Sequence, residues 1–477
     1  MLANFYRLIS KCRKIKQNHT KCIYLPKIFQ MRQFIVLVFI LSFATAGMSQ
    51  QTSFKIMTQE QRSVWVDSML EYRIENMLPD LMRRSGIDMW IIISREYNED
   101  PVMKTMLPSS WLSARRRTIM VFYDPGEGKK LEKIAIARYD VGRLLKGEWN
   151  LDVYPDQWEA LVNVVKKYNP NKIGINTSEH FGHADGLVAT EKEHLLRALP
   201  QEFHPKIVSA ENLAIGWLET RSNMEIEFYK ELCALSRSII MRGFDPKFIK
   251  TGKTTTDDIV WRLRQLVTDM GLDAWFHPTV SVQREDKTNF DHLRSFSGRP
   301  KGQVIQHGDL LHVDFGITYN RLNTDQQQHF YVLKPGEKDI PPSIQKAFAT
   351  ANRLQDILTD QFALSRSGNE ILAQALSKAK EEGITASIYT HPIGFHGHAA
   401  GPTIGMWDQQ GGVKGPGDYI VYPNTAYSIE LNAASEIPEW GKVIRIMLEE
   451  DGYYDATGFR YIGGRQKAVY LVNRPKG

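Results

Sequence analysis

The chain has 477 residues, of which 42% are hydrophobic, 24% are charged and three are cysteines, and this length is enough for two or three domains with developed cores. Its formal net charge is +6, but the first 50 residues hold eight Lys and Arg and no acidic residue, which leaves 52 basic against 54 acidic residues in the remainder. The basic balance therefore belongs to the N-terminal segment, and charge gives no case for nucleic-acid binding by the whole protein.

Residues 1–50 have the pattern of an export leader. After Met31 and a basic residue, a ten-residue apolar run begins at Phe34 and is followed by Ala44 and Ala46 in A-x-A spacing. This pattern is typical of a secretory signal peptide and is short for a membrane span; an uncleaved N-terminal anchor is the alternative. We expect translation to start at Met31 and the protein to be secreted or periplasmic. We also expect no stable membrane insertion after leader removal, since no other run of 18 apolar residues follows.

Residues 51–212 alternate between helical and strand patterns. The expected helices are 57–85 and 156–168, and the expected strands are 88–94, 117–123, 133–138 and 172–176. These patterns predict a mixed α/β domain. We find no catalytic constellation in it, so we expect the chemistry to lie in the second half of the chain.

Residues 213–477 begin with helices and end in glycine-rich loops and strands. The expected helices are 223–242, a helix that begins with the capping-box pattern Thr255-x-x-Asp258 and ends at Gly271, 342–364 and 368–382. The expected strands include YSIELNA and VIRIMLEEDGYY. The helix starts rest on capping chemistry and the strands on their apolar, β-branched composition.

The stretch from Leu311 to Leu333 reads as a β-hairpin whose two arms each carry an aspartate. Asp314 and Asp325 are eleven residues apart, so a turn near Asn320 places the two carboxylates opposite each other on one face. Opposed carboxylates on an apolar hairpin are costly unless a cation lies between them, which indicates a metal. The alternative is that each aspartate caps a turn.

Four further residues beyond this hairpin carry chemistry. His391 and His398 lie in an H-x-x-G-x-x-x-H run, Glu430 lies in a strand pattern, and Glu449 lies in another. Each of them alone also fits a structural role, such as a hydrogen-bonded histidine or a polar strand end. With Asp314 and Asp325, the two glutamates make four carboxylates, and four carboxylates with one histidine suit two divalent ions, with Mn²⁺, Fe²⁺, Co²⁺ and Zn²⁺ all compatible.

The order of these motifs resembles the pita-bread dinuclear metallopeptidases, a family that includes Xaa-Pro aminopeptidase, prolidase, methionine aminopeptidase and the metal-free creatinase. The matching positions are Asp314 with Gly316, Asp325, His391 with Gly394 and His398, Glu430, Glu449 with Gly458, and the opening helix at Ser222, Glu225 and Glu227. The resemblance covers nearly the whole mature chain. It implies an α/β N-terminal creatinase-like domain, residues 51–212, followed by an α+β pita-bread catalytic domain, residues 213–477.

Carried over position by position, the resemblance also implies a ligand set. Asp314 would bind one ion, Asp325 and Glu449 would bridge both ions, and His391 with Glu430 would complete the other site. Of the metals allowed by these ligands, we expect Mn²⁺.

The same resemblance assigns catalytic roles. Glu430 would take the proton from a bridging water and return it to the leaving nitrogen, and His398 would contact the substrate carbonyl. His292 stands where the family places a histidine near the scissile nitrogen, although its distance from Asp314 is longer than usual in these enzymes.

The chain departs from the family pattern around the substrate pocket. Ser387 replaces a common histidine, and Gln326-Gln327-Gln328 follows Asp325 in place of I-T-R. A second register would align Arg445-Ile446 with the family's R-I-E motif and put Met447 at the last ligand position. We prefer Glu449, because only that register also aligns Gly458. The metal site therefore looks kept while the substrate pocket looks altered.

The expected function is a metallo-aminopeptidase that hydrolyses the N-terminal Xaa-Pro bond of short peptides by means of a metal-bridging hydroxide. The alternatives are an Xaa-Pro dipeptidase, a metallohydrolase of the same fold acting on a non-peptide substrate, and a non-catalytic binding protein on that fold. The family resemblance further implies a homodimer or homotetramer.

Overall fold

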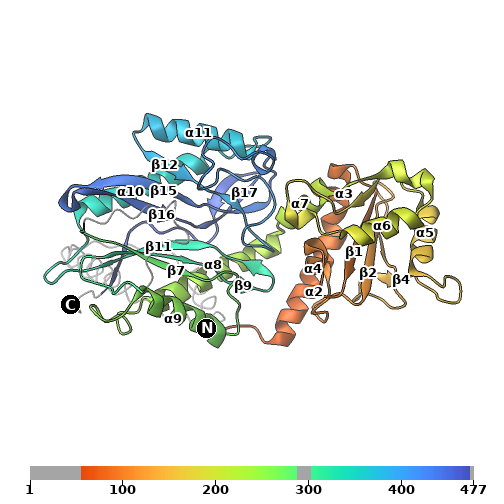
Figure 1. Cartoon of the computed structure of the whole chain (residues 1–477), viewed down its shortest axis with the longest axis horizontal. Helices are drawn as coiled ribbons and strands as arrows, with labels where there is room; N and C mark the ends of the chain where they lie inside the picture. Colours follow the sequence, from red (N-terminus) through yellow and green to blue (C-terminus); the bar gives the residue numbers. More distant parts are fainter. Residues whose placement is uncertain (1–54, 287–301, 473–477) are drawn as a thin grey trace, which may run out of the picture. The chain divides into compact units, whose positions relative to one another are not determined.

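The computed structural model describes residues 55–286 and 302–472, which cover the two expected domains apart from one internal segment and the ends. The fold class expected from the sequence is confirmed: an α/β N-terminal part precedes an α+β C-terminal part built on curved sheets (Figure 1). Within these described residues, no helix is both long and apolar enough to cross a membrane.

The N-terminal part is a mixed six-stranded sheet covered by helices. Its strands lie in the order β4-β3-β2-β1-β5-β6, with β1 antiparallel to β2 and parallel to β5. The strands are β1 Met89–Arg95, β2 Arg117–Tyr123, β3 Glu132–Ala135, β4 Lys146–Gly147, β5 Ile173–Ile175 and β6 Ile207–Ser209. Apolar side chains from both faces of β1 are buried, which explains the unbroken hydrophobic run read from the sequence.

The helices of this part differ in one place from the expectation. The predicted helix 57–85 is two helices, α2 Gln59–Asn76 and α3 Leu78–Ser85, because Pro79 lies in the first turn of α3, where it has no N–H to donate to the preceding turn. The other helices are α4 Pro101–Met106, α5 Gln157–Tyr168, α6 Ala189–Ala198 and α7 Glu211–Glu219, with short 3-10 turns η1 Gly182–Ala184 and η2 Gln201–Lys206.

One sheet of the C-terminal part carries the predicted hairpin. Its strands lie in the order β19-β11-β8-β7 and comprise β7 Thr279–Gln283, β8 Leu310–Phe315, β11 Gln326–Val332 and β19 Tyr470–Val472. A small ribbon of β9 Thr318–Tyr319 and β10 Leu322–Asn323 forms the tip of the hairpin. Helices α8 Asn223–Gly243 and α9 Thr256–Asp269 pack on this sheet (Figure 1).

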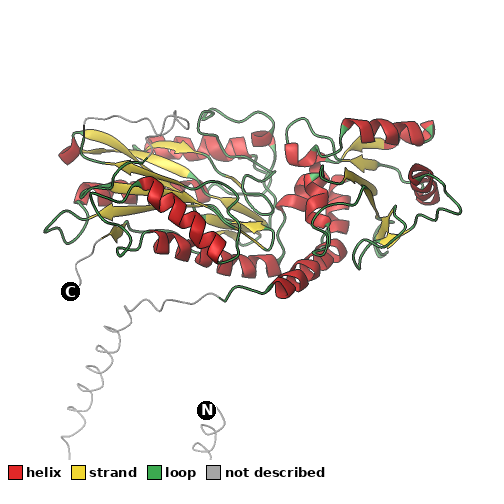
Figure 2. Cartoon of the chain, turned by 60° about the horizontal axis from the view of Figure 1, so that its bottom comes forward, coloured by secondary structure: helices red, strands yellow, loops and turns green. Residues whose placement is uncertain are grey.

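Two further sheets complete the C-terminal part. One is β12 Thr385–Ile388, β15 Leu431–Ile437 and β16 Lys442–Leu448, and the other is β13 His391–Pro392, β14 Thr425–Ser428, β17 Asp451–Asp455 and β18 Gly458–Tyr461. Helices α10 Pro342–Thr359 and α11 Gly368–Glu381 cover β15 and β12, and Figure 2 shows helices flanking the strands. The 3-10 turns η3 Pro416–Asp418 and η4 Pro438–Trp440 lie in the connections.

Two strands expected to be continuous change sheets at a glutamate. The stretch YSIELNA divides into β14 and β15 with Glu430 between them, and VIRIMLEEDGYY divides into β16 and β17 with Glu449 between them. The N–H of Ile429 donates to the carbonyl of Glu450 at 3.0 Å, so the two crossing points lie beside each other. Helix α10 also ends earlier than the expected residue 364, at Thr359.

Candidate metal centre

The two aspartates of the hairpin lie on one face, two residues out of direct register. Asp314 in β8 pairs with Gln327 in β11, and Asp325 comes just before β11 begins. The direct opposition expected from the sequence is therefore a diagonal one, because the ribbon β9–β10 takes up the residues of the turn. A diagonal pair on one face still brings the two carboxylates close together.

Gly316 explains why the first aspartate lies in a D-x-G motif. A Cβ at this position would collide with the Thr324 carbonyl and the Trp275 indole. The missing side chain lets the hairpin tip close, and the Trp275 Nε1–H donates to the Thr324 carbonyl at 2.8 Å, directly before Asp325.

The glutamates come from the two places where strands change sheets. Glu449 is buried, and its Oε1 accepts a hydrogen bond from Ser428 Oγ at 2.6 Å. Glu430 is half-buried at the neighbouring crossing point. A break in a strand frees its residue from the alternation of a regular sheet, so both carboxylates turn toward the same space between the sheets.

His391 opens β13, and its ring orientation is set by the backbone. Its Nδ1–H donates to the Pro392 carbonyl at 3.0 Å, which leaves the lone pair of Nε2 free. That Nε2 is buried without a hydrogen-bond partner and lies 3.7 Å from Glu449 Oε1. An imidazole held in this orientation presents Nε2 to a cation in the site.

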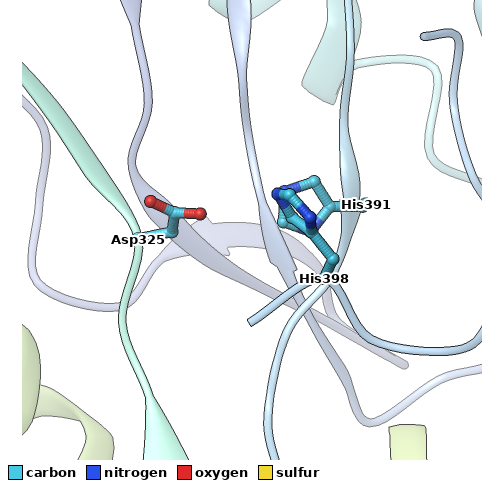
Figure 3. Close-up of side chains that lie close together, drawn as sticks. All are labelled: Asp325, His391 and His398. Carbon is cyan, nitrogen blue, oxygen red and sulfur yellow. The ribbon is translucent and has the colours of Figure 1, made fainter. Parts of the chain in front are cut away.

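The five predicted ligands form overlapping groups. The ligand atoms of Asp314, Asp325 and Glu449 lie within 4.8 Å of one another, and so do those of His391, Glu430 and Glu449. Glu449 belongs to both groups, as a bridging carboxylate requires. Figure 3 shows the Asp325 carboxylate pointing toward the imidazoles of His391 and His398, and these three also form a group within 4.8 Å.

The polar atoms of this site fit divalent cations. Asp325 Oδ1, like His391 Nε2, is buried and has no hydrogen-bond partner. Burial raises the pKa of Asp325 well above its ordinary value, and the carboxylates of Glu449, Asp314 and Glu430 raise it further. A cation among the carboxylates offsets both the cost of burying the charge of Asp325 and the repulsion between the acids. The residues present therefore suit two oxygen-preferring divalent ions.

A cavity of about 430 Å³ opens beside these ligands. The residues that line it are Trp275, Phe276, His277, Thr279, His312, Asp314, Asp325, Gln327, Ser387, Tyr389, His398, Trp407, Glu430, Leu431, Asn432, Met447 and Glu449. The His398 ring packs edge-on against Trp275, with centroids 5.3 Å apart, and against His391, with centroids 4.7 Å apart. The His398 residue is partly exposed, but desolvation of its ring and the neighbouring His391 lower its pKa to about 4, so its imidazole is neutral at pH 7.

Not every position singled out in the sequence lies within this cluster. His292 falls outside the described residues. Met447, the ligand in the rejected register, and Ser387 line the cavity, but the ligand groups contain Glu449.

Sequence reasoning missed three residues that hold the ligands in place. Ser428 and Gln327 hydrogen-bond to Glu449, and Asp451 Oδ1 accepts from the Asp325 N–H at 3.2 Å. A sequence signal existed for Ser428 and Gln327. Each lies two positions from a predicted ligand, Ser428 before Glu430 and Gln327 after Asp325, and residues two apart in a strand face the same side.

Comparison with known proteins gives one matching family model and several solved structures of the same fold. Residues 227–451 match the family model Metallopeptidase family M24. An X-Pro aminopeptidase from Thermotoga maritima MSB8 has the same fold, with a TM-score of 0.58 and 15% identity over 82% of this chain and 100% of that chain. No curated protein sequence matches the chain significantly.

Two further solved structures share the fold at similarly low identity. An Xaa-Pro dipeptidase from Bacillus anthracis has a TM-score of 0.56 and 15% identity, over 86% of this chain and 99% of that one. A prolidase from Pyrococcus horikoshii OT3 has a TM-score of 0.52 and 14% identity, over 84% of this chain and 99% of that one. These likenesses extend over both parts of the chain and show the fold.

Proposed function

We propose that this protein is a metal-dependent exopeptidase that releases the residue before proline from the N-terminus of short peptides, because residues 227–451 match the family model Metallopeptidase family M24 on a pita-bread fold. The observation that carries the proposal is the pair of three-ligand groups that share Glu449 beside a cavity of about 430 Å³. The solved structures of the same fold named X-Pro aminopeptidase and Xaa-Pro dipeptidase support the proline preference.

Five residues are the proposed metal ligands. Asp314, Asp325, His391, Glu430 and Glu449 hold the ions, which supply Lewis acidity and lower the pKa of water when they are bound. Four carboxylates and one imidazole favour Mn²⁺, and Co²⁺, Fe²⁺ and Zn²⁺ are compatible with the same set.

Proton transfer and orientation are assigned to groups at the cavity wall. Glu430 is half-buried and lines the cavity, so its carboxylate accepts the proton of the attacking water and delivers it to the leaving nitrogen. His398, neutral at pH 7, orients the peptide by hydrogen bonding at its carbonyl. Trp275, Phe276 and Trp407 provide apolar wall against which a proline ring packs.

The experiment combines metal analysis with peptide hydrolysis. Protein that begins at Gln51 is assayed for metal by elemental analysis, then incubated with Mn²⁺ and Gly-Pro or a tripeptide that begins Gly-Pro. Two metal equivalents and release of glycine from the tripeptide support the aminopeptidase, with the same tripeptide carrying alanine in place of proline as the control. Hydrolysis of the dipeptide alone indicates the dipeptidase, and two bound ions without peptide cleavage contradict the peptidase proposal.

Oligomeric state and location complete the proposal. We infer a homodimer or homotetramer that is exported after removal of residues 1–50. Size-exclusion chromatography with light scattering, and N-terminal sequencing of the exported protein, test these two points.

A further inference from the structure

Gln327 connects the two crossing points that supply the glutamate ligands. Its side-chain Nε2 donates to Glu430 Oε1 at 3.0 Å and to Glu449 Oε2 at 2.7 Å. Its backbone N–H donates to the Glu449 carbonyl at 3.0 Å. One glutamine therefore holds a ligand of each strand break, from a strand that belongs to neither of them.

The other end of the same amide is held by a histidine. His312 Nε2 lies 2.8 Å from Gln327 Oε1. Both hydrogens of the Gln327 amide point to carboxylate oxygens, so its carbonyl faces His312, and the His312 Nε2–H donates to that carbonyl. Nδ1 of that tautomer is an acceptor, and Ser281 Oγ lies 3.4 Å from it. The donors therefore run in one direction, from Ser281 through His312 and Gln327 to Glu430 and Glu449.

The sheet fixes every member of this chain. Ser281 is the cross-strand partner of His312, and Gln327 is the partner of Asp314, two residues after His312. All of Ser281, His312 and Gln327 are at least nine-tenths buried, with 7%, 2% and 5% of their surfaces exposed. Buried side chains on three paired strands have little freedom to rotate. The pairing of the strands therefore fixes which atom of each side chain donates to the next.

The neighbouring glutamines show that this arrangement is specific to one position. Gln326 Nε2 donates to the Cys233 carbonyl at 3.4 Å, and Gln328 Nε2 donates to Glu450 Oε1 at 2.8 Å. Glu450 is outside the ligand groups and is paired with Arg237 at 2.8 Å. Gln327 differs from both neighbours in that its amide ends on two candidate ligands.

We propose that Gln327 is a positioning residue of the metal centre, and that His312 holds its amide in the one orientation that directs both N–H groups to Glu430 and Glu449. An amide turned by 180° would aim its carbonyl at two carboxylates, which would push them away from the ions. Fixed donors instead orient the carboxylates so that their remaining lone pairs face the metal. This inference rests on the proposed function, because it takes Glu430 and Glu449 as ligands.

The first test replaces the amide with a side chain of similar length. Metal-free Gln327→Met is titrated with Mn²⁺ by calorimetry, and the visible absorption of its Co²⁺ form is recorded. We expect metal affinity to fall by about 10- to 100-fold, as for other residues that hydrogen-bond metal ligands, with a changed Co²⁺ spectrum. The matched control is Gln328→Met, which removes a buried amide-carboxylate hydrogen bond next door and should keep both readouts within about twofold of wild type.

A second pair of variants tests the orientation of the amide without touching it. His312→Gln keeps a donor near the position of the imidazole Nε2, so it should retain most of the metal affinity. His312→Leu removes the donor, so its affinity should fall. Equal affinities for these two variants, or wild-type affinity and spectrum in Gln327→Met, would overturn the positioning role. Wild-type protein that binds no metal in the same titration would instead overturn the proposed function.

Discussion

Two buried charged clusters of this protein are built in opposite ways. Glu225 is fully buried at the start of α8, where Arg73 Nη1 contacts its Oε2 at 2.8 Å and Arg221 Nη1 contacts its Oε1 at 2.9 Å. Asp325 is equally enclosed, but the groups that act on its charge most strongly are the carboxylates of Glu449 and Asp314.

The pKa values of the two acids follow from this difference. Burial by itself raises the pKa of Glu225, but Arg221 and Arg73 outweigh it and hold that pKa below its ordinary value. For Asp325, burial and the neighbouring carboxylates act in the same direction and raise the pKa. The first cluster carries its own cations and serves the fold. In the second, the charge of Asp325 is offset by a bound proton or by cations from solution, and the latter is what the proposed metal site requires.

The largest expected effect comes from removing the carboxylate of Asp325, whose Oδ1 is buried without a hydrogen-bond partner. Asp325→Asn should abolish both tight Mn²⁺ binding and peptide hydrolysis, because the amide supplies neither the charge nor the bridging oxygens. Calorimetric titration and the tripeptide assay measure the two losses. Asp140→Asn, at an exposed aspartate paired with Lys146, is the matched control. Hydrolysis at the wild-type rate in Asp325→Asn contradicts the assignment of the centre.

Disrupting the cluster around Glu225 should lower the stability of the fold and leave metal binding unchanged. Glu225→Gln leaves two buried arginines without their counter-charge, so we expect the free energy of unfolding to fall by about 3–5 kcal/mol. Urea denaturation of the metal-free protein measures this loss. The number of Mn²⁺ ions bound by the folded variant should stay at the wild-type value, and a loss of metal sites would contradict the separation of the two clusters.

The two acids should also respond to pH with opposite signs in the metal-free protein. Asp325 has a folded-state pKa above its ordinary value of 3.8, so its contribution to stability is full below that pH and is lost as pH rises through the folded pKa. Glu225 has a folded-state pKa below its ordinary value of 4.5, so its contribution is present above pH 4.5 and is lost as pH falls through the folded pKa.

This contrast is measurable by urea denaturation in the presence of a chelator. Relative to Asp325→Asn, the wild type should lose stability as pH rises from 4, whereas relative to Glu225→Gln it should lose stability as pH falls below 4.5. Saturating Mn²⁺ should remove the first trend, because the bound cations favour the ionised carboxylate. A trend for Asp325 that persists unchanged in Mn²⁺ would show that no ion binds beside it.

The smallest effect is expected for an arginine–glutamate ion pair that lies on the surface. Arg353 and Glu382 form a two-point contact at 2.8 and 2.7 Å, and Glu382 is exposed. Glu382→Gln should change the urea midpoint far less than Glu225→Gln, since water already solvates both charges. Comparable losses in the two variants would show that burial is not what separates the clusters.

Several features of the molecule were determined by local sequence. The capping box of Thr255 with Asp258 forms as the spacing predicts, because its hydrogen bonds join residues three apart. Ser222 and Glu225 form a second capping box of the same spacing. The apolar runs of β1 and β2 predict strands of nearly the observed length, since each run is buried as a unit. The candidate ligands were also chosen from local signals, as acids or histidines within apolar strands.

Tertiary structure decided how those residues meet. No local pattern showed that Glu430 and Glu449 would lie where strands pass from one sheet to another, because continuous β-propensity runs through both breaks. The Gln327 amide hydrogen-bonds to residues 103 and 122 positions away, and its orientation depends on His312 across the strand pair. Helices and caps depend on neighbours within a few residues, whereas this centre depends on the register between strands from distant parts of the chain, which only the folded sheets establish.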